Sequence, residues 1–193
     1  KSVTISEGVE TIGGYAFNAC EKLAGITIPG SVKKLGSCSF QNTGIENVTL
    51  FNGIQSISEK TFSYCTSLTE VVLPESITYV DSSAFAGCSS LLNVKVDDDN
   101  TVYCDVDGIL FNKDVSAICI YPAGRQGVYI MPDTVTKVEN YAFYRCVGLT
   151  DIVFSDNLET IGDYSFYDAR IDRLVFPDSL KTIGDAAFQQ DWG

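Results

Sequence analysis

The chain contains no histidine, and this absence excludes much of the chemistry that proteins perform near neutral pH. A Ser–His or Cys–His pair needs an imidazole base, and imidazole is also a frequent metal ligand. None of the seven cysteines belongs to a C-x-x-C pair, which argues against a zinc ribbon or a dithiol redox site. Paired carboxylates can hydrolyse glycosides without histidine, but Asp163 and Asp185 fall in turns, where solvated aspartates are common. We therefore expect no enzyme activity and no cofactor.

Basic residues are also scarce, since 13 lysines and arginines stand against 25 acidic residues and leave a net charge of −12. Nucleic acids and anionic membrane surfaces both attract basic proteins, so we expect neither as a partner. No apolar run is long enough for a transmembrane helix, and no signal peptide precedes the first expected strand. We expect a fragment of a longer protein whose signal and anchor lie elsewhere, with Trp192 as the visible cover for its last coil.

What the chain has instead is a phenylalanine that returns every 22 or 23 residues, with one longer gap. A small residue precedes each of these phenylalanines, and apolar residues stand five and eight positions before it. A fixed period of this length is typical of a solenoid, in which each repeat forms one coil of a stack. The repeated residues are Phe17, Phe40, Phe62, Phe85, Phe143, Phe166 and Phe188.

Each repeat also contains a three-residue run whose first and third side chains should point into the coil, as in a half-buried strand. No window shows the sustained period of a long helix, so helix should be limited to short turns around the phenylalanines. The sequence thus predicts one domain over residues 1–193, a curved, right-handed, β-rich solenoid of about seven repeats with an insertion near 97–128. The expected strands are 3–5, 26–28, 48–50, 71–73, 94–96, 129–131, 152–154 and 174–176.

This pattern resembles the BspA-like leucine-rich repeats, also called the Treponema pallidum type. One copy of the pattern reads Leu23, Ile26, Ile28, Pro29, Val32, Leu35, Gly36 and Phe40, and another runs from Leu68 through Pro74 to Phe85 and Cys88. The insertion, with Tyr103, the run 107–114 and Tyr121-Pro122, is similar to the long, hairpin-containing repeat of that family. The resemblance implies a leucine-rich repeat domain of a secreted or surface protein of host-associated bacteria. It also implies a role in attachment or protein binding.

The cysteines are expected to pack and not to form a disulfide framework. Four of them stand three residues after a repeat phenylalanine and should form one buried column. Cys104 and Cys119 in the insertion could pair across a hairpin, and Cys38 is the thiol expected to be exposed. The four column cysteines are Cys20, Cys65, Cys88 and Cys146.

An acidic run at Asp97–Asn100, followed by Asp105 and Asp107, raises the alternative of a calcium site. The spacing is not that of an EF-hand loop, and Asp107-Gly108 is an ordinary turn signal. We therefore expect a solvated turn here and retain calcium only as an alternative.

The first candidate binding surface is the row of middle strand residues, which should point out of the coils. The row is polar early in the chain and apolar late, and an exposed apolar surface often marks an interaction site. The other interpretation is strand propensity, since threonine and valine both favour strands. The apolar candidates in the row are Val72, Ile130, Val153 and Val175.

The second candidate is a group of four tyrosines that two adjacent coils should bring together beside Arg145 and Arg170. Tyr141 and Tyr164 stand two residues before a repeat phenylalanine, and Tyr144 and Tyr167 stand one residue after it. Tyrosine is favoured at binding surfaces, but these rings could also simply pack on one another. Together the observations predict a protein-binding or adhesion module at a bacterial surface, with a host matrix protein or another surface protein as partner. A structural spacer and a carbohydrate-active or calcium-binding domain are the alternatives.

Overall fold

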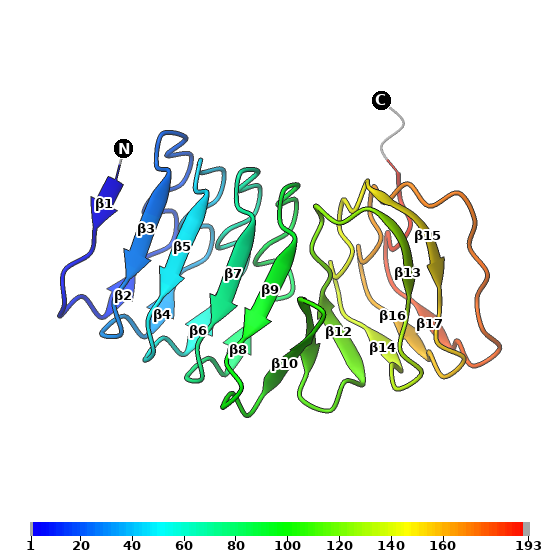
Figure 1. Ribbon diagram of the computed structural model, residues 1–193. Helices are drawn as coiled ribbons and strands as arrows, with labels where there is room; N and C mark the ends of the chain where they lie inside the picture. The colour runs from blue at the N-terminus through cyan, green and yellow to red at the C-terminus, as the bar shows by residue number, and fades with distance from the viewer. Residues whose placement is uncertain (1, 191–193) are drawn as a thin grey trace.

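The computed structural model describes residues 2–190, which form a solenoid of stacked coils (Figure 1). One wall of the solenoid, called the sheet face here, consists of the longer parallel strands. They are β1 (Ser2–Thr4), β3 (Gly25–Ile28), β5 (Asn47–Leu50), β7 (Glu70–Leu73), β9 (Asn93–Val96), β13 (Gly127–Ile130) and β15 (Leu149–Val153). The strands pair within three groups, β1-β3-β5, β7-β9 and β13-β15, so that Val3 lies opposite Ile26 and Ile26 lies opposite Val48. The 22- or 23-residue period therefore becomes a column of equivalent side chains.

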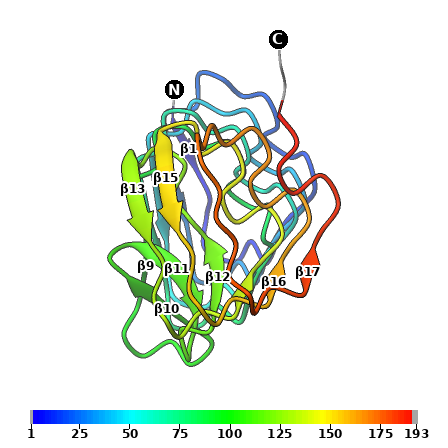
Figure 2. The same cartoon turned by 90° about the vertical axis from the view of Figure 1, so that its right-hand side faces the viewer.

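The opposite wall is built from two-residue strands, and Figure 2 shows β16 and β17 across the molecule from β13 and β15. These short strands are β2 (Thr11–Ile12), β4 (Lys34–Leu35), β6 (Ser56–Ile57), β8 (Tyr79–Val80), β14 (Lys137–Val138), β16 (Thr160–Ile161) and β17 (Thr182–Ile183). Their inward residues, such as Leu35 and Ile57, are fully buried between the two walls. The repeated apolar positions of the sequence thus form the continuous interior of the stack.

The turn around each phenylalanine contains no helix within residues 2–190, so the predicted short helical turns are wrong. In five of these turns, those of Phe17, Phe40, Phe62, Phe143 and Phe166, the residues two before and two after the phenylalanine adopt positive φ, for example Cys38 at 57° and Asn42 at 56°. A left-handed residue cannot continue a right-handed helix. The chain forms another ladder between coils here, in which the Phe40 N–H donates to the Thr61 carbonyl at 2.9 Å.

The phenylalanine rings stack along the interior of the solenoid. Neighbouring rings from Phe17 to Phe85 lie 5.2, 5.3 and 5.4 Å apart, and Phe143 lies 4.5 Å from Phe166. Tyr121 occupies the next position in this column, with its ring 4.7 Å from that of Phe143. Its N–H donates to the Ala142 carbonyl, as the repeat phenylalanines do in their own coils. Tyr121 therefore takes the place of a repeat phenylalanine within the long gap between Phe85 and Phe143.

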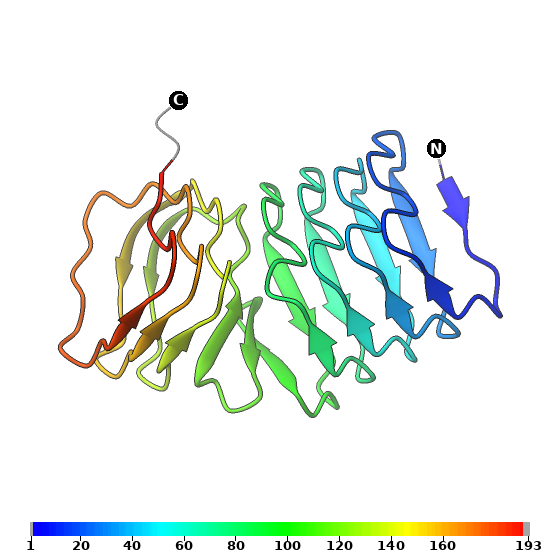
Figure 3. The ribbon, with the colours of Figure 1, turned by 180° about the vertical axis from the view of Figure 1, so that it is seen from behind.

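The insertion forms the predicted hairpin, made of β10 (Tyr103–Val106) and β11 (Ile109–Asn112), and continues into β12 (Ala117–Ile120). Both faces of β11 are buried. Leu110 packs in the core of the first stack, residues 2–96, whereas Ile109 and Phe111 pack in the core of the second stack, residues 121–190. The hairpin thus joins two hydrophobic cores, and Figure 3 shows it between the two groups of coils.

The cysteines pack as predicted at three positions, while two predictions fail. Cys65, Cys88 and Cys146 are fully buried, but Cys20 is exposed because no described coil packs against its outer side. Cys38, predicted to be exposed, is buried in the column between Tyr15 and Lys60, and Tyr15 makes a side-chain hydrogen bond with it.

All seven thiols are free. Cys104 and Cys119 lie on strands β10 and β12, and β11 runs between these strands. The Cys104 thiol donates instead to the Asn112 carbonyl at 3.3 Å. A bridge across the hairpin is therefore not formed.

The expected strand at 174–176 is also absent from the described strands. Val153 accepts a hydrogen bond from the Met131 N–H, so the backbone groups of Ile152 point the other way, toward residues 173–177. The Ile152 N–H donates to the Asp151 carboxylate at 2.8 Å. The Phe154 and Phe176 rings still stack 5.6 Å apart, so the side chains follow the repeat while the backbone ladder stops at β15. Trp192, the expected cover of the last coil, lies outside the described residues.

Candidate binding surfaces

The sheet face of the second stack exposes a group of large apolar side chains. The structure brings Ile130 and Val153 together as paired residues of β13 and β15, and Val175 occupies the equivalent position of the next coil. Val128, which the sequence reasoning did not select, extends the group along β13. The exposed fractions are 61% for Val128, 70% for Ile130, 51% for Val153 and 61% for Val175. We call these four residues the valine patch.

Val72, the fourth apolar residue predicted for this row, lies apart from the valine patch. It is exposed on β7, where its paired neighbour on β9 is Lys95. The Lys95 amine lies 3.0 Å from the Glu70 carboxylate, so charged side chains border Val72 on its own sheet. The hairpin then separates β9 from β13 (Figure 1). The predicted row therefore divides into an isolated valine and a contiguous patch.

A groove of about 520 Å³ opens within the second sheet face, between β15 and the segment 173–178. Its two sides carry equivalent residues of successive coils: Val153 and Val175 in the middle, and Asp156 and Asp178 at one end. No backbone hydrogen bond joins these two sides within the described residues. The groove thus combines apolar side chains, backbone groups that are not paired between the two coils, and one acidic end.

The sheet face of the first stack has a hollow of similar size but different chemistry. Its volume is about 560 Å³, and its outward side chains include Thr4, Thr27 and Thr49. Strand pairing is continuous there from β1 through β3 to β5. The same coil geometry therefore presents hydroxyl groups at one end of the chain and bare hydrocarbon at the other.

The four predicted tyrosines lie together as the register predicts. Tyr141 stacks on Tyr164 and Tyr144 stacks on Tyr167, each pair with ring centroids 5.2 Å apart. Tyr141 and Tyr144 are 5.4 Å apart, which closes the group across the turn. In each pair one flat face of each ring covers the other ring and is unavailable to a ligand. This arrangement favours packing over binding.

A fifth tyrosine joins this group from the other side of the insertion. The Tyr64 hydroxyl lies 3.0 Å from the Tyr144 hydroxyl, although 80 residues separate them. The ring of Tyr64 passes over Gly87, where an added Cβ would lie 2.9 Å from the ring. Burial, followed by the hydrogen bond with Tyr64, raises the pKa of Tyr144.

Arg145 reinforces the same contact, because its guanidinium lies 5.8 Å from the centre of the Tyr64 ring and its Nε lies 3.2 Å from Asp168. Arg170, the other predicted arginine, is exposed. No spacing in the sequence points to this contact, because Tyr64 stands two residues after its repeat phenylalanine and Tyr144 stands one residue after its own.

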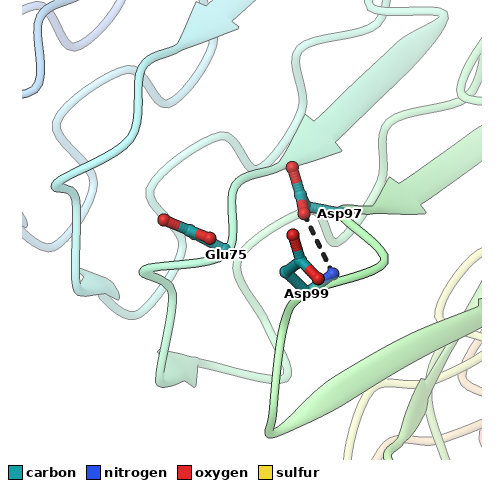
Figure 4. A group of neighbouring side chains, drawn as sticks. All are labelled: Glu75, Asp97 and Asp99. Atoms are coloured by element: carbon teal, nitrogen blue, oxygen red, sulfur yellow. Dashed lines mark hydrogen bonds between the residues drawn. The ribbon is translucent and has the colours of Figure 1, made fainter.

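The acidic run does not assemble into the calcium set that the sequence suggested. Asp105 accepts hydrogen bonds from the N–H groups of Val96 and Gly108, and the buried Asn100 side chain bonds the turn of the preceding coil. Among the described residues, only Asp97, Asp99 and Glu75 place carboxylate oxygens within 4.8 Å of one another, and all three are exposed (Figure 4). Calcium takes six to eight oxygen ligands, whereas this group offers three carboxylates from two turns.

The described part of the chain holds no helix that is long and apolar enough to span a bilayer.

A family model described as the BspA type leucine-rich repeat region matches residues 1–106 and 127–192 in six copies. The unmatched residues coincide with β11, β12 and the turn that follows. Among curated protein sequences, no relative matches the chain.

Solved structures of bacterial leucine-rich repeat proteins share the fold. A leucine-rich repeat protein from Eubacterium ventriosum is 24% identical, with a TM-score of 0.81 over 95% of this chain and 55% of its own. The pneumococcal vaccine antigen PcpA is 26% identical, with a TM-score of 0.79 over 93% of this chain and 51% of its own. A leucine-rich cell surface protein from Faecalibacterium prausnitzii is 18% identical, with a TM-score of 0.52 over 97% of this chain and 78% of its own. The chain thus spans about half the length of the first two proteins.

Proposed function

Because the chain belongs to the BspA-type leucine-rich repeat family, we propose that it is a non-catalytic protein-binding module of a bacterial surface protein, as the resemblance to a vaccine antigen and to a cell surface protein suggests. The observation that carries the proposal is the valine patch. Exposed apolar side chains that lie together on one face are typical of interaction surfaces. The solenoid supplies a rigid, repetitive face on which an extended partner can lie. The partner proposed is a protein, such as a host matrix protein or another surface protein.

The main alternative is a spacer that holds other domains of a longer protein away from the cell. A spacer needs only polar surfaces, and the first sheet face, with its threonines, would satisfy that requirement. The second sheet face does not, because about half or more of each valine-patch side chain is exposed to water. Exposed apolar side chains lower the solubility of a protein, so their presence favours a binding role over a spacer role. A carbohydrate-active or calcium-binding role has no comparable support in the residue arrangement.

The double variant Val153→Ser and Val175→Ser tests the proposal. Both side chains point outward, so we expect the melting temperature to change by only a few degrees. Binding to a natural partner should weaken by at least about tenfold if the two side chains lie at the centre of the contact. The matched control is Thr27→Ser with Thr49→Ser, which changes the equivalent positions of the first stack. Equal affinity of the double variant and the wild type for that partner would contradict the proposal.

A further inference from the structure

We propose that the groove between β15 and residues 173–178 binds an extended segment of the partner protein that carries a basic residue at one end. This inference rests on the proposed function and specifies which part of the partner is recognised. Three features of the groove lead to it: an open strand edge, an apolar middle and an acidic end.

The open edge favours an extended backbone as the ligand. Within residues 2–190, the segment 173–178 runs beside β15 without a ladder hydrogen bond to it, and β15 pairs only with β13. The Ile152 N–H points into this gap and is satisfied by the neighbouring Asp151 carboxylate. A strand edge of this kind offers main-chain donors and acceptors at the spacing of another extended chain. A flexible side-chain carboxylate is a partner that such a chain can displace.

The middle of the groove favours apolar side chains on the ligand. Val153 and Val175 lie on its two sides with more than half of each side chain exposed. Along a strand, side chains on one face alternate with those on the other. A bound extended segment would therefore place every second side chain on the two valines.

The acidic end favours a basic residue. Asp156 and Asp178 stand at equivalent positions of successive coils, and Asp133 stands at the same position one coil earlier. All three are exposed, and within the described residues none forms an ion pair. At the other end of the groove, Asp151 and Arg173 stand at equivalent positions of successive coils and carry opposite charges. Like charges at adjacent coils repel, so a lysine or arginine at the acidic end would relieve that repulsion.

The first part of the chain does not combine these features at the same column. The residues there are Glu7, Gly30, Asn52, Glu75 and Asp98, and the Asn52 side chain donates a hydrogen bond to the Glu75 carboxylate. Glu75 and Asp98 are adjacent acidic residues, but they follow β7 and β9, which pair with each other and place Lys95 beside Val72. The combination of an open edge, two valines and adjacent aspartates belongs to the second stack.

Synthetic peptides provide the test. We would measure binding of fluorescein-labelled peptides with alternating valine and threonine that end in two lysines, at either terminus, or in two glutamates. The lysine peptide of the favoured polarity should bind at least about tenfold more tightly than the glutamate peptides. The double variant Asp156→Asn and Asp178→Asn should remove this preference, and added salt should reduce it in the wild type. The corresponding neutralisation of two acidic residues on the first stack, Glu7→Gln with Glu75→Gln, should leave the preference for the lysine peptide intact.

The experiments distinguish a wrong assignment of the groove as a peptide site from a wrong proposal of protein binding. If the peptides bind without regard to charge, and amide chemical shifts change around Val153 and Val175, the patch binds protein but the basic segment is wrong. If the shifts change elsewhere, or no peptide binds, the groove is not a peptide site. Loss of natural-partner binding in the valine double variant would still support the proposed function in that case. A dimer of the chain in sedimentation that covers the groove would also overturn the inference.

Discussion

The two stacks of this solenoid repeat the same buried columns in their two cores and differ in their surfaces. In the first stack the outward strand residues are mostly threonines, and the turns carry an amide ladder in which Asn18 donates to Gln41 and Gln41 donates to Ser63. In the second stack the same positions hold the valine patch and the paired tyrosines. Since both surfaces are compatible with the same buried columns, the coil does not require the apolar face. This difference supports the proposal that the binding surface lies on the second stack.

The largest expected effect comes from separating the two cores at the hairpin. Phe111→Ala removes a fully buried ring from the second core and should cost about 3–5 kcal/mol of unfolding free energy. In a solenoid the loss should stay near the altered coil, so amide exchange should accelerate in residues 121–190 and change little in residues 2–96. Leu110→Ala, on the opposite face of β11, is the matched control and should give the reverse pattern. Uniform acceleration in both variants would show that the hairpin does not divide the cores.

The tyrosine group should contribute stability to the second stack and not affinity. Replacing Tyr144 and Tyr167 with serine removes two stacked rings and the hydroxyl partner of Tyr64, at an expected cost of about 2–4 kcal/mol. Thermal unfolding measures this loss, while affinity for the partner should be retained. The control Tyr15→Ser changes an exposed ring of the first stack and should cost less than about 1 kcal/mol. Lost affinity at unchanged stability would instead place a binding site on the tyrosines.

Alkaline pH should weaken the second stack through its buried tyrosines. Burial raises the pKa of Tyr121 to about 12, and burial also raises the pKa of Tyr129 above its ordinary value. Tyrosines in the unfolded chain ionise near pH 10, so the unfolded state loses its protons first. The stability contributed by these groups is complete below about pH 10 and is lost as the pH rises toward the folded-state values.

The measurement is the free energy of unfolding between pH 9 and pH 12, followed with tyrosinate absorbance. Tyr129→Phe is an informative control, because its buried hydroxyl has no hydrogen-bond partner within the described residues. The variant should keep its stability at pH 8 and lose less of it at high pH. An unchanged pH dependence in this variant would exclude Tyr129 as a contributor.

The repeat period predicted most of the fold because it fixes which side chains share a column. Once Phe40 and Phe62 are known to stack, the burial of Leu35 and Ile57 and the exposure of Thr27 and Val153 follow from strand alternation. The turns were less predictable, since a left-handed residue such as Cys38 redirects the chain without any glycine to signal it. Burial of the Cys38 thiol is a consequence of that redirected turn.

The candidate site was predictable only in part. The spacing of 22 residues between Tyr121 and Phe143 signals that Tyr121 continues the column of stacked rings. A repeat defined by phenylalanine alone misses this position. The end of the ladder at β15 has no such signal, because Leu174–Phe176 has the same alternation as the paired strands. Hydrogen bonding between coils depends on backbone position, which side-chain patterns do not encode. The groove therefore emerged only from the structure.

The most direct test of the central claim is an unbiased selection of binders, followed by mapping of where they bind. Peptides selected from a random displayed library on the folded chain would be mapped by amide hydrogen exchange. We expect protection of residues 127–130, 149–153 and 173–178, with no change on β1, β3 and β5. Protection concentrated on the threonine face of the first stack, or spread evenly over both stacks, would contradict the assignment of binding to the second stack.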